Sequence, residues 1–211
     1  MTTCGRFITF EGIEGVGKST QLKHLAKQLG NAGREVLVTR EPGGTPLAEK
    51  IRALVLGDAG EAVPPVAELL LMFAARAVHT ENLVRPALVR GAWVLCDRYT
   101  DATFAYQGGG RGVPAEEIES LARIAHRRVT PDLTLLLDAP VSVALARARG
   151  RAGTADRIEA ETVAFFERVR ACYLERAAAE PKRVRRIDAS RSENEVERAV
   201  WAEVALLAGT G

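Results

Sequence analysis

Apolar residues gather in five short runs along the chain, and longer segments with helical spacing separate these runs. The runs are rich in Val, Ile, Leu and Phe, which is typical of buried strands. They cover residues 7–10, 34–39, 93–97, 133–138 and 184–188. Between them, apolar residues recur every three or four positions, as at Leu22, Leu25, Ala26 and Leu29. This alternation predicts an α/β fold in which a five-stranded parallel sheet carries helices on both faces.

The first run leads directly into a glycine-rich turn. Residues 12–19 read Gly-Ile-Glu-Gly-Val-Gly-Lys-Ser and match the pattern G-x-x-x-x-G-K-[ST]. In such a loop the backbone N–H groups, the start of the next helix and the lysine together surround an anion. A nucleotide polyphosphate fits this arrangement, with the Ser19 hydroxyl beside a bridging magnesium ion. The nucleotide-binding residues are therefore expected to be Gly12, Ile13, Glu14, Gly15, Val16, Gly17, Lys18, Ser19 and Thr20.

Whole-chain properties narrow the class of protein. The 211 residues suit one α/β domain, so we expect a single domain over residues 1–211. A net charge of +2 is too small to indicate a nucleic-acid or membrane surface, and no apolar run approaches 18 residues. Cys4, Cys96 and Cys172 are widely spaced, which predicts neither a disulfide framework nor a zinc site. The N-terminus is too short for a signal peptide before the first strand, so we expect a cytoplasmic protein.

Polar segments follow the second and third predicted strands. After the second, Arg40–Thr45 forms a tight turn, and the next helix carries Arg52 off its apolar face. Arg52 there is either a ligand-binding charge or an exposed surface arginine. The third strand ends at Asp97 and Arg98, and ligands of open α/β sheets bind at such strand ends. Asp97 is thus a candidate for the metal or a proton and Arg98 for phosphate, with a structural ion pair as the alternative.

The predicted helices contain a second candidate pocket. Met72, Phe73 and Arg76 lie within about one helical turn, where they would form either an apolar wall with a guanidinium beside it or ordinary core. Thr100–Tyr106 predicts a short helix, and the glycines of Gln107–Gly112 predict a flexible tether.

The chain also contains a basic segment after the fourth predicted strand and two histidines, His79 and His126, in or next to predicted helices. Residues 147–156 are rich in Arg, Gly and Ala, which suits either a lid that closes over phosphates or an exposed loop. His79 and His126 have no partner that the sequence identifies, and no acid, His and Ser set indicates hydrolytic chemistry.

Taken together, these segments resemble the thymidylate kinase family over nearly the whole chain. The resemblance is carried by FEGIEGVGKSTQ, TREPGGT, FAAR, DRYTDATFAYQGGGRG and the arginine-rich run that ends in ADRIEAE. It implies a P-loop NTPase-like three-layer fold of the nucleoside monophosphate kinase type, with a small lid at about residues 148–156. It also implies that the protein phosphorylates dTMP to dTDP with ATP and Mg²⁺ in dTTP biosynthesis, and that it forms a homodimer.

The resemblance further implies a role for each site residue. Lys18 and Ser19 would serve ATP and Mg²⁺, and Asp97 would order the metal and the attacking oxygen. The lid would carry the catalytic arginine, Arg149 or Arg151. The dTMP site would comprise Glu14 at the 3′-hydroxyl, Arg52 and Arg98 at the phosphate, Met72 and Phe73 at the base, Arg76 at its O4, Thr103 at its edge, Tyr106 at the 2′ position and Gln107 nearby.

Two positions depart from the family pattern, and two other functions compete with it. Met72 stands where a Phe or Tyr usually stacks on the base, and Ala102 replaces a usual Ser, so base discrimination is affected more than chemistry. The rival functions are a kinase for another nucleoside or nucleoside monophosphate, and a regulator that binds nucleotide as a signal. Against a GTP switch, the chain has no N-K-x-D segment.

Overall fold

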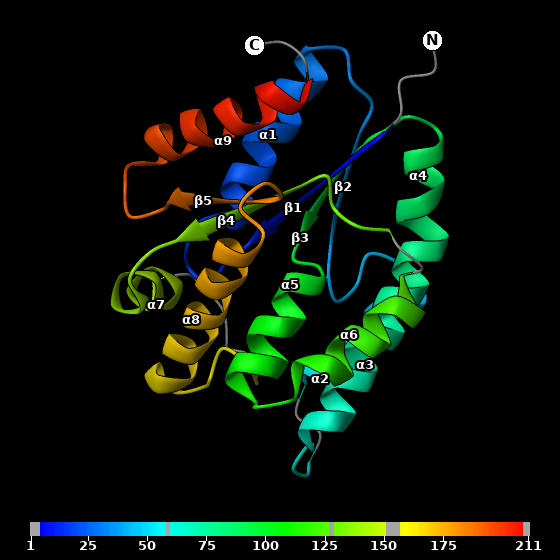
Figure 1. Cartoon of the computed structure of the whole chain (residues 1–211), viewed down its shortest axis with the longest axis vertical. Coiled ribbons are helices and arrows are strands. Elements are labelled where there is room, and N and C mark those ends of the chain that lie inside the picture. Colours follow the sequence, from blue (N-terminus) through cyan, green and yellow to red (C-terminus); the bar gives the residue numbers. More distant parts are fainter. Residues whose placement is uncertain (1–4, 58–59, 127–128, 151–156, 209–211) are drawn as a thin grey trace.

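All five strands run parallel in one sheet, which confirms the predicted fold class. The computed structural model describes residues 5–57, 60–126, 129–150 and 157–208. Phe10 and Arg40 both lie beside Asp97, so the carboxyl ends of three neighbouring strands meet at one edge. The strand order is β2-β3-β1-β4-β5 (Figure 1), with β1 at Arg6–Glu11, β2 at Val36–Arg40, β3 at Trp93–Asp97, β4 at Leu133–Asp138 and β5 at Val184–Asp188.

Helices form the connections between the strands. None of the helices in the described ranges is both long enough and apolar enough to cross a membrane. The α-helices are α1 (Lys18–Asn31), α2 (Pro46–Leu56), α3 (Pro65–His79), α4 (Arg85–Val89), α5 (Thr100–Thr103), α6 (Ala115–Ala125), α7 (Val141–Arg149), α8 (Val163–Ala179) and α9 (Glu193–Ala208). Two π-helical segments lie at Thr80–Val84 and Phe104–Gly110.

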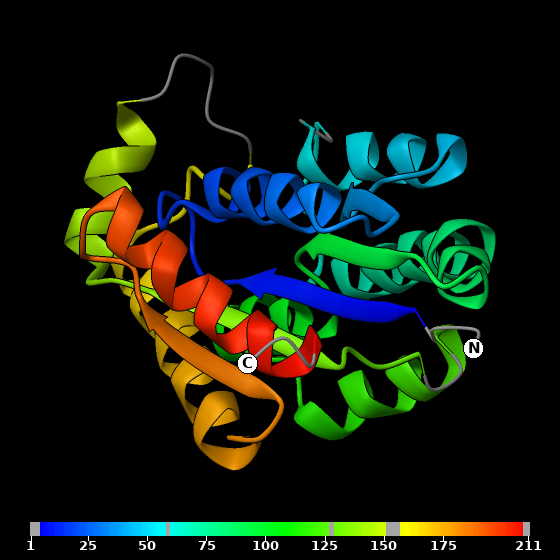
Figure 2. The ribbon, with the colours of Figure 1, turned by 90° about the horizontal axis from the view of Figure 1, so that it is seen from above.

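Alternating side chains along β1 divide the core between the two faces of the sheet. Ile8 and Phe10 are fully buried and belong to one hydrophobic cluster with Leu25 of α1. Phe7 points to the other face, where its ring meets the ring of Tyr99 edge-on with centroids 4.9 Å apart. Figure 2 shows α1 and α8 on opposite sides of β1. The sheet therefore forms the middle layer of three.

The long helix predicted from residue 65 to about residue 90 is continuous but irregular. Its irregular turn is the π-helical segment Thr80–Val84, which lies before the predicted bend at Pro86. Pro86 itself lies in the first turn of α4. A proline is tolerated there because the first N–H groups of a helix have no partner within it.

The segment Gln107–Gly110, which the sequence predicts as a flexible tether, is helical instead. It continues α5 as the π-helical segment Phe104–Gly110 and packs against α8. A Cβ at Gly109 would lie 2.7 Å from the Cβ of Cys172, and one at Gly110 would lie 2.5 Å from the nearest atom of the Phe165 ring. Glycine is therefore required for close packing between the helices rather than for flexibility.

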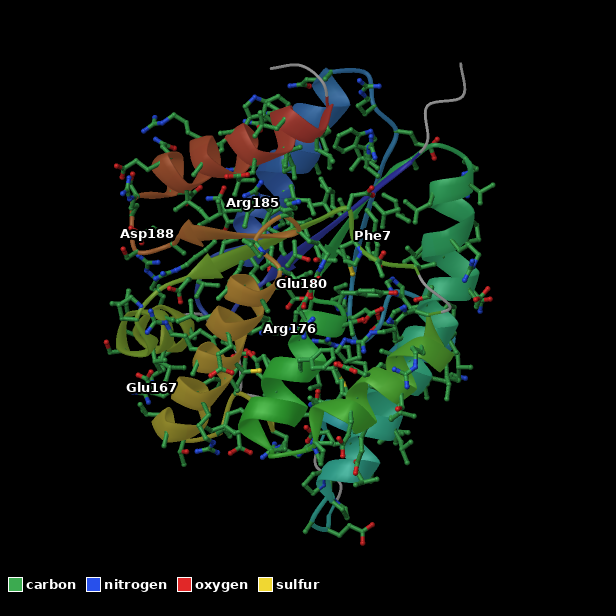
Figure 3. The ribbon with its side chains drawn as sticks, viewed as in Figure 1. Phe7, Glu167, Arg176, Glu180, Arg185 and Asp188 are labelled. Atoms are coloured by element: carbon green, nitrogen blue, oxygen red, sulfur yellow. The ribbon has the colours of Figure 1, made fainter. Side chains whose placement is uncertain are left out.

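An ion-pair cluster holds α5 against the end of the molecule that carries β5. The buried carboxylate of Asp101 accepts hydrogen bonds from Arg176 Nε at 2.6 Å and from Arg183 Nη1 at 2.7 Å. Figure 3 labels Arg176, in the last turn of α8, and Glu180, directly after this helix; the two side chains pair at 3.2 Å. These ion pairs thus fix the position of α5, which follows β3, from outside the sheet.

Replacement of Gly109 by Ala tests the helix contact. We expect the free energy of unfolding to fall by about 1–3 kcal/mol, because the added methyl group overpacks a rigid contact. Urea denaturation measures the change. Gly30→Ala in α1 is the matched control, since a Cβ there has no heavy atom within 4 Å. It should leave stability unchanged or raise it by up to about 1 kcal/mol; equal losses in the two variants would contradict the packing explanation.

Candidate active site

A cavity of about 450 Å³ lies where the carboxyl ends of β1, β2 and β3 meet. It brings together most of the residues that the sequence predicts for the two nucleotides. The predicted residues in its wall are Glu14, Gly15, Gly17, Lys18, Ser19, Thr20, Arg52, Met72, Asp97, Arg98, Tyr106 and Gln107. Gly12, Ile13 and Val16 belong to the same loop but are buried behind the wall.

Two glycines allow the loop after β1 to pass between β4 and α7. Gly12 has φ +126° and Gly15 has φ +80°, a range that side chains disfavour. A Cβ at Gly12 would collide with the carbonyl oxygen of Leu137, and one at Gly15 with the carbonyl oxygen of Ala144. Both backbone conformation and close packing therefore require glycine at these two positions of the motif.

The amine of Lys18 lies inside the loop. Nζ donates hydrogen bonds to the carbonyl oxygens of Gly12 at 3.0 Å and Ile13 at 2.9 Å. The side chain is buried, and this burial, together with the charge of Arg98, lowers the pKa of Lys18 to about 8. An anion that enters the loop therefore stabilises the charged form of Lys18.

Ser19 and Asp97 present two oxygen groups side by side. The Ser19 hydroxyl donates to Asp97 Oδ2 at 3.1 Å, from the start of α1 to the end of β3. Hydroxyl and carboxylate oxygens are ligands that Mg²⁺ prefers. Within the described ranges, no group of three or more His, Cys, Asp or Glu side chains could hold a metal ion. Ser19 and Asp97 offer two oxygen groups of this kind, so their chemistry suits Mg²⁺.

Arg98 is held next to Lys18 by the loop itself, since both side chains donate to the Gly12 carbonyl oxygen. Its φ is +70°, an uncommon conformation for a residue with a side chain. Nη2 donates to Glu14 Oε1 at 2.6 Å, and Nη1 donates to the Gly12 carbonyl at 3.0 Å. The guanidinium lies over the Tyr106 ring, 4.7 Å from its centroid, while the Tyr106 hydroxyl donates to Glu14. These contacts orient a planar donor group toward the cavity.

Three further residues predicted to bind the acceptor, Arg52, Met72 and Gln107, also line the cavity. Arg52 is not a free surface charge, because Nη1 donates to the Pro42 carbonyl at 2.9 Å. Met72 is buried in the wall with only 7% of its surface exposed. Gln107 is also buried, and its amide donates to Glu68 at 2.7 Å.

Arg76, Phe73 and Thr103 lie behind the cavity wall. The Arg76 guanidinium donates to Glu41 at 2.6 Å, to the Thr103 hydroxyl at 2.9 Å and to the Tyr99 carbonyl at 3.0 Å. It also lies 4.9 Å from the centroid of the Phe73 ring. The three residues therefore form one buried polar and aromatic layer, and their contact with a base stays a prediction.

His79 has two buried partners that the sequence does not identify. Its ring nitrogens lie 2.8 Å from Glu41 Oε1 and 2.7 Å from the Thr39 hydroxyl. Burial alone would raise the pKa of Glu41, but Arg76 and His79 hold it below its ordinary value. The ring nitrogens of His126 are buried and have no hydrogen-bond partner among the described residues.

Of the two candidate catalytic arginines, the structure describes Arg149, which is not among the wall residues. Arg149 is exposed at the last residue of α7, and Arg151 lies outside the described residues, as does most of the expected lid at 148–156. Arg147 does line the cavity and donates to the Ala189 carbonyl at 2.7 Å. Arg147 begins the basic segment, but the sequence pattern does not indicate a separate role for it.

Sequence reasoning also missed several other residues of the wall. Arg40, Glu41 and Pro42 come from the segment TREPGGT, whose position after a strand was the available signal. Leu56 and Ile158 gave no such signal, because isolated apolar residues near helix ends are ordinary core positions.

Known proteins resemble this chain over almost its full length. The thymidylate kinase family model matches residues 10–200. Thymidylate kinase of Pseudomonas entomophila (strain L48) is 55% identical over 198 residues, which are 94% of each chain. That of Alcanivorax borkumensis is 55% identical over 186 residues, 88% of this chain and 89% of the relative. The crystal structure of thymidylate kinase from Ehrlichia chaffeensis, with 32% identity, covers 95% of this chain and 98% of its own at a TM-score of 0.77. This chain therefore belongs to the thymidylate kinase family.

Proposed function

We propose that the cavity holds ATP and dTMP end to end, with the phosphate loop on the donor side and Arg52 and Arg98 on the acceptor side. As a member of its family, the protein phosphorylates dTMP in dTTP biosynthesis and takes the phosphate from ATP. The observation that carries the site assignment is that Lys18, Ser19 and Arg98 line one cavity. Two bound nucleotides in line need little more than positioning and charge neutralisation for transfer.

On the donor side, the loop amides and Lys18 bind the phosphates of ATP. The Lys18 amine exchanges its bonds to the Gly12 and Ile13 carbonyls for phosphate oxygens. Ser19 and Asp97 would hold a Mg²⁺ ion, which would supply charge neutralisation for the phosphates. Asp97 also orients the attacking phosphate oxygen of dTMP.

On the acceptor side, Arg98 and Arg52 bind the phosphate of dTMP. The Arg98 guanidinium is already fixed by Glu14 and Gly12, so it meets the phosphate with little loss of side-chain freedom. Glu14 accepts from the 3′-hydroxyl of the deoxyribose, and Tyr106 fills the space that a 2′-hydroxyl would need. Gln107 lies near the same nucleoside.

At the base end, Met72 and Phe73 supply the apolar contact, while Arg76 and Thr103 read the base edge. The three hydrogen bonds of Arg76 to Glu41, Thr103 and Tyr99 fix the orientation of its guanidinium. A thioether at residue 72 provides contact area without a flat face. This change raises the KM for dTMP before it affects kcat.

Further proposals concern the whole chain. Residues 1–211 form one domain with a lid at about 148–156, and the protein is a cytoplasmic homodimer. The exposed side chains of Leu47 and Leu54 on α2 and of Val66 and Leu70 on α3 support self-association, because each leaves half or more of its surface uncovered. The cysteines within the described ranges are free, which suits a reducing compartment.

A panel of acceptors tests the proposed function. With ATP as donor, we expect kcat/KM to be highest for dTMP, lower for dUMP, and negligible for CMP, AMP and thymidine. A coupled assay of ADP formation measures each rate, and chelation of Mg²⁺ should abolish all of them. Nucleotide binding without transfer to any acceptor would identify a regulator instead, and a preference for another acceptor would identify a different kinase.

Alanine variants of the basic segment test the lid assignment. Loss of the catalytic arginine should lower kcat by about 10³–10⁵, as for other arginines that neutralise a transferring phosphoryl group. Arg149→Ala, Arg151→Ala and the double variant are compared in steady-state assays. Arg198→Ala is the control, because Arg198 is exposed on α9. If the double variant keeps kcat within a few-fold of wild type, neither arginine is catalytic.

The pH dependence of stability tests the burial of Lys18. Because its pKa in the folded protein is about 8 and its ordinary value is 10.5, the unfolded chain binds more protons between these pH values. Wild-type stability therefore rises through this window relative to Lys18→Met, which has no amine to titrate. Below pH 8 the free energy of unfolding of Lys18→Met is highest relative to wild type, because the wild-type amine is charged and buried. By pH 10.5 this difference should fall by up to roughly 3 kcal/mol.

Urea unfolding of both proteins between pH 7 and pH 10.5 measures this difference. Lys27→Met, at an exposed position of the same helix, is the matched control. A difference between Lys18→Met and wild type that does not change with pH would show that the amine is not buried in solution.

A further inference from the structure

Glu11, the last residue of β1, is a buried carboxyl group just before the phosphate loop. None of its surface is exposed. Oε1 accepts a hydrogen bond from the Tyr99 backbone N–H at 2.7 Å, and Oε2 accepts one from the Tyr173 hydroxyl at 2.7 Å. Burial, with the charge of Asp101 as a smaller cause, raises the pKa of Glu11 to about 8. A carboxyl group in such a place is costly for the fold, so its two contacts need an explanation.

The first contact of Glu11 fixes the backbone around Arg98. Arg98 has φ +70°, and such a conformation persists only where neighbouring groups hold it. The N–H of Arg98 donates to the Phe10 carbonyl at 2.9 Å, and the N–H of the next residue, Tyr99, donates to Glu11. The end of β1 therefore holds the N–H groups at both ends of the Arg98 residue.

The second contact reaches the Arg98 side chain. Tyr173 comes from α8, and 2% of its surface is exposed. Its hydroxyl accepts from Arg98 Nη1 at 3.3 Å and donates to Glu11 at 2.7 Å. The Tyr173 oxygen therefore links the buried carboxyl group to the guanidinium.

We propose that Glu11 is a positioning residue for phosphoryl transfer, which holds Arg98 in its phosphate-binding conformation through Tyr99 and Tyr173. The proposal rests on the role of Arg98 under the proposed function. Glu11 itself is not among the residues of the cavity wall. Its absence would leave Arg98 present but free to move, and displacements of about 1 Å in a transfer site lower rates by about 10²-fold.

The protonation state of Glu11 does not decide the positioning. An ionised carboxylate accepts from both partners. A neutral carboxyl group accepts from the Tyr99 N–H with one oxygen and donates to the Tyr173 oxygen with the other. The amide of a glutamine has the same acceptor and donor arrangement, whereas a methionine of similar length has neither.

The test compares Glu11→Gln with Glu11→Met at pH 7. We expect Glu11→Gln to keep kcat/KM for dTMP within about threefold of wild type and Glu11→Met to lose about 10- to 100-fold. The KM for ATP should stay within about twofold in both, because the donor loop is not displaced. Direct titration of dTMP binding provides a readout that does not need turnover.

A structural control and a second background separate positioning from loss of fold. Thr9 lies on the same face of β1 as Glu11, and its hydroxyl forms a buried hydrogen bond with Thr134 of β4. Thr9→Val removes this bond, so it should destabilise the protein but leave kcat/KM unchanged. In an Arg98→Lys background, Glu11→Met should lower kcat/KM by no more than about twofold further, because the group that Glu11 positions is already altered.

The outcomes distinguish the proposal from its alternatives. If Glu11→Met retains wild-type kcat/KM, or loses as much activity in the Arg98→Lys background as in wild type, the proposal is wrong. It is also wrong if Glu11→Gln is as impaired as Glu11→Met. If Glu11→Met does not fold, Tyr173→Phe decides, since loss of the linking hydroxyl should raise the KM for dTMP several-fold. Wild type that fails to phosphorylate dTMP would contradict the proposed function instead.

Discussion

The arrangement of this site depends on charged side chains that partners within the protein hold in fixed positions. Lys18 donates to two carbonyls of its own loop, Arg98 pairs with Glu14, and Arg76 pairs with Glu41. Buried pairs of this kind add little net stability, because the loss of hydration offsets much of their attraction. Each pair does fix a charged group in place, so a phosphorylated ligand meets an environment that is already oriented. The parallel sheet makes this possible, since its strand ends deliver the groups to one edge.

Most of the fold could be predicted from the sequence because its strands are continuous apolar runs. β3, β4 and β5 have the predicted bounds, and the glycine motif correctly placed the loop between β1 and α1. Gln107–Gly110 could not be predicted as helical, because a run of glycines has low intrinsic helix propensity. Contacts with Cys172 and Phe165, more than fifty residues away in sequence, override that preference.

The candidate site could be predicted where one local pattern carries the chemistry, as at Lys18, Ser19 and Asp97. It could not be predicted where the role depends on a distant partner. Arg76 and Glu41 are separated by 35 positions, and neither has a local signature that indicates a buried pair. Glu11 is hidden in the same way, since a single acid at the end of an apolar strand reads as the start of a loop. Its partners on α8 and after β3 become apparent only in three dimensions.

The internal bonds of Lys18 bear on how the enzyme releases its product. When a nucleotide leaves, the amine does not remain as a stranded buried cation, because the Gly12 and Ile13 carbonyls stand ready as acceptors within the same loop. Departure therefore exchanges hydrogen bonds to phosphate for hydrogen bonds to carbonyl groups, which offsets part of the interaction that is lost. The same exchange limits how tightly any nucleotide can bind. The loop backbone thus lowers the cost of releasing a nucleotide.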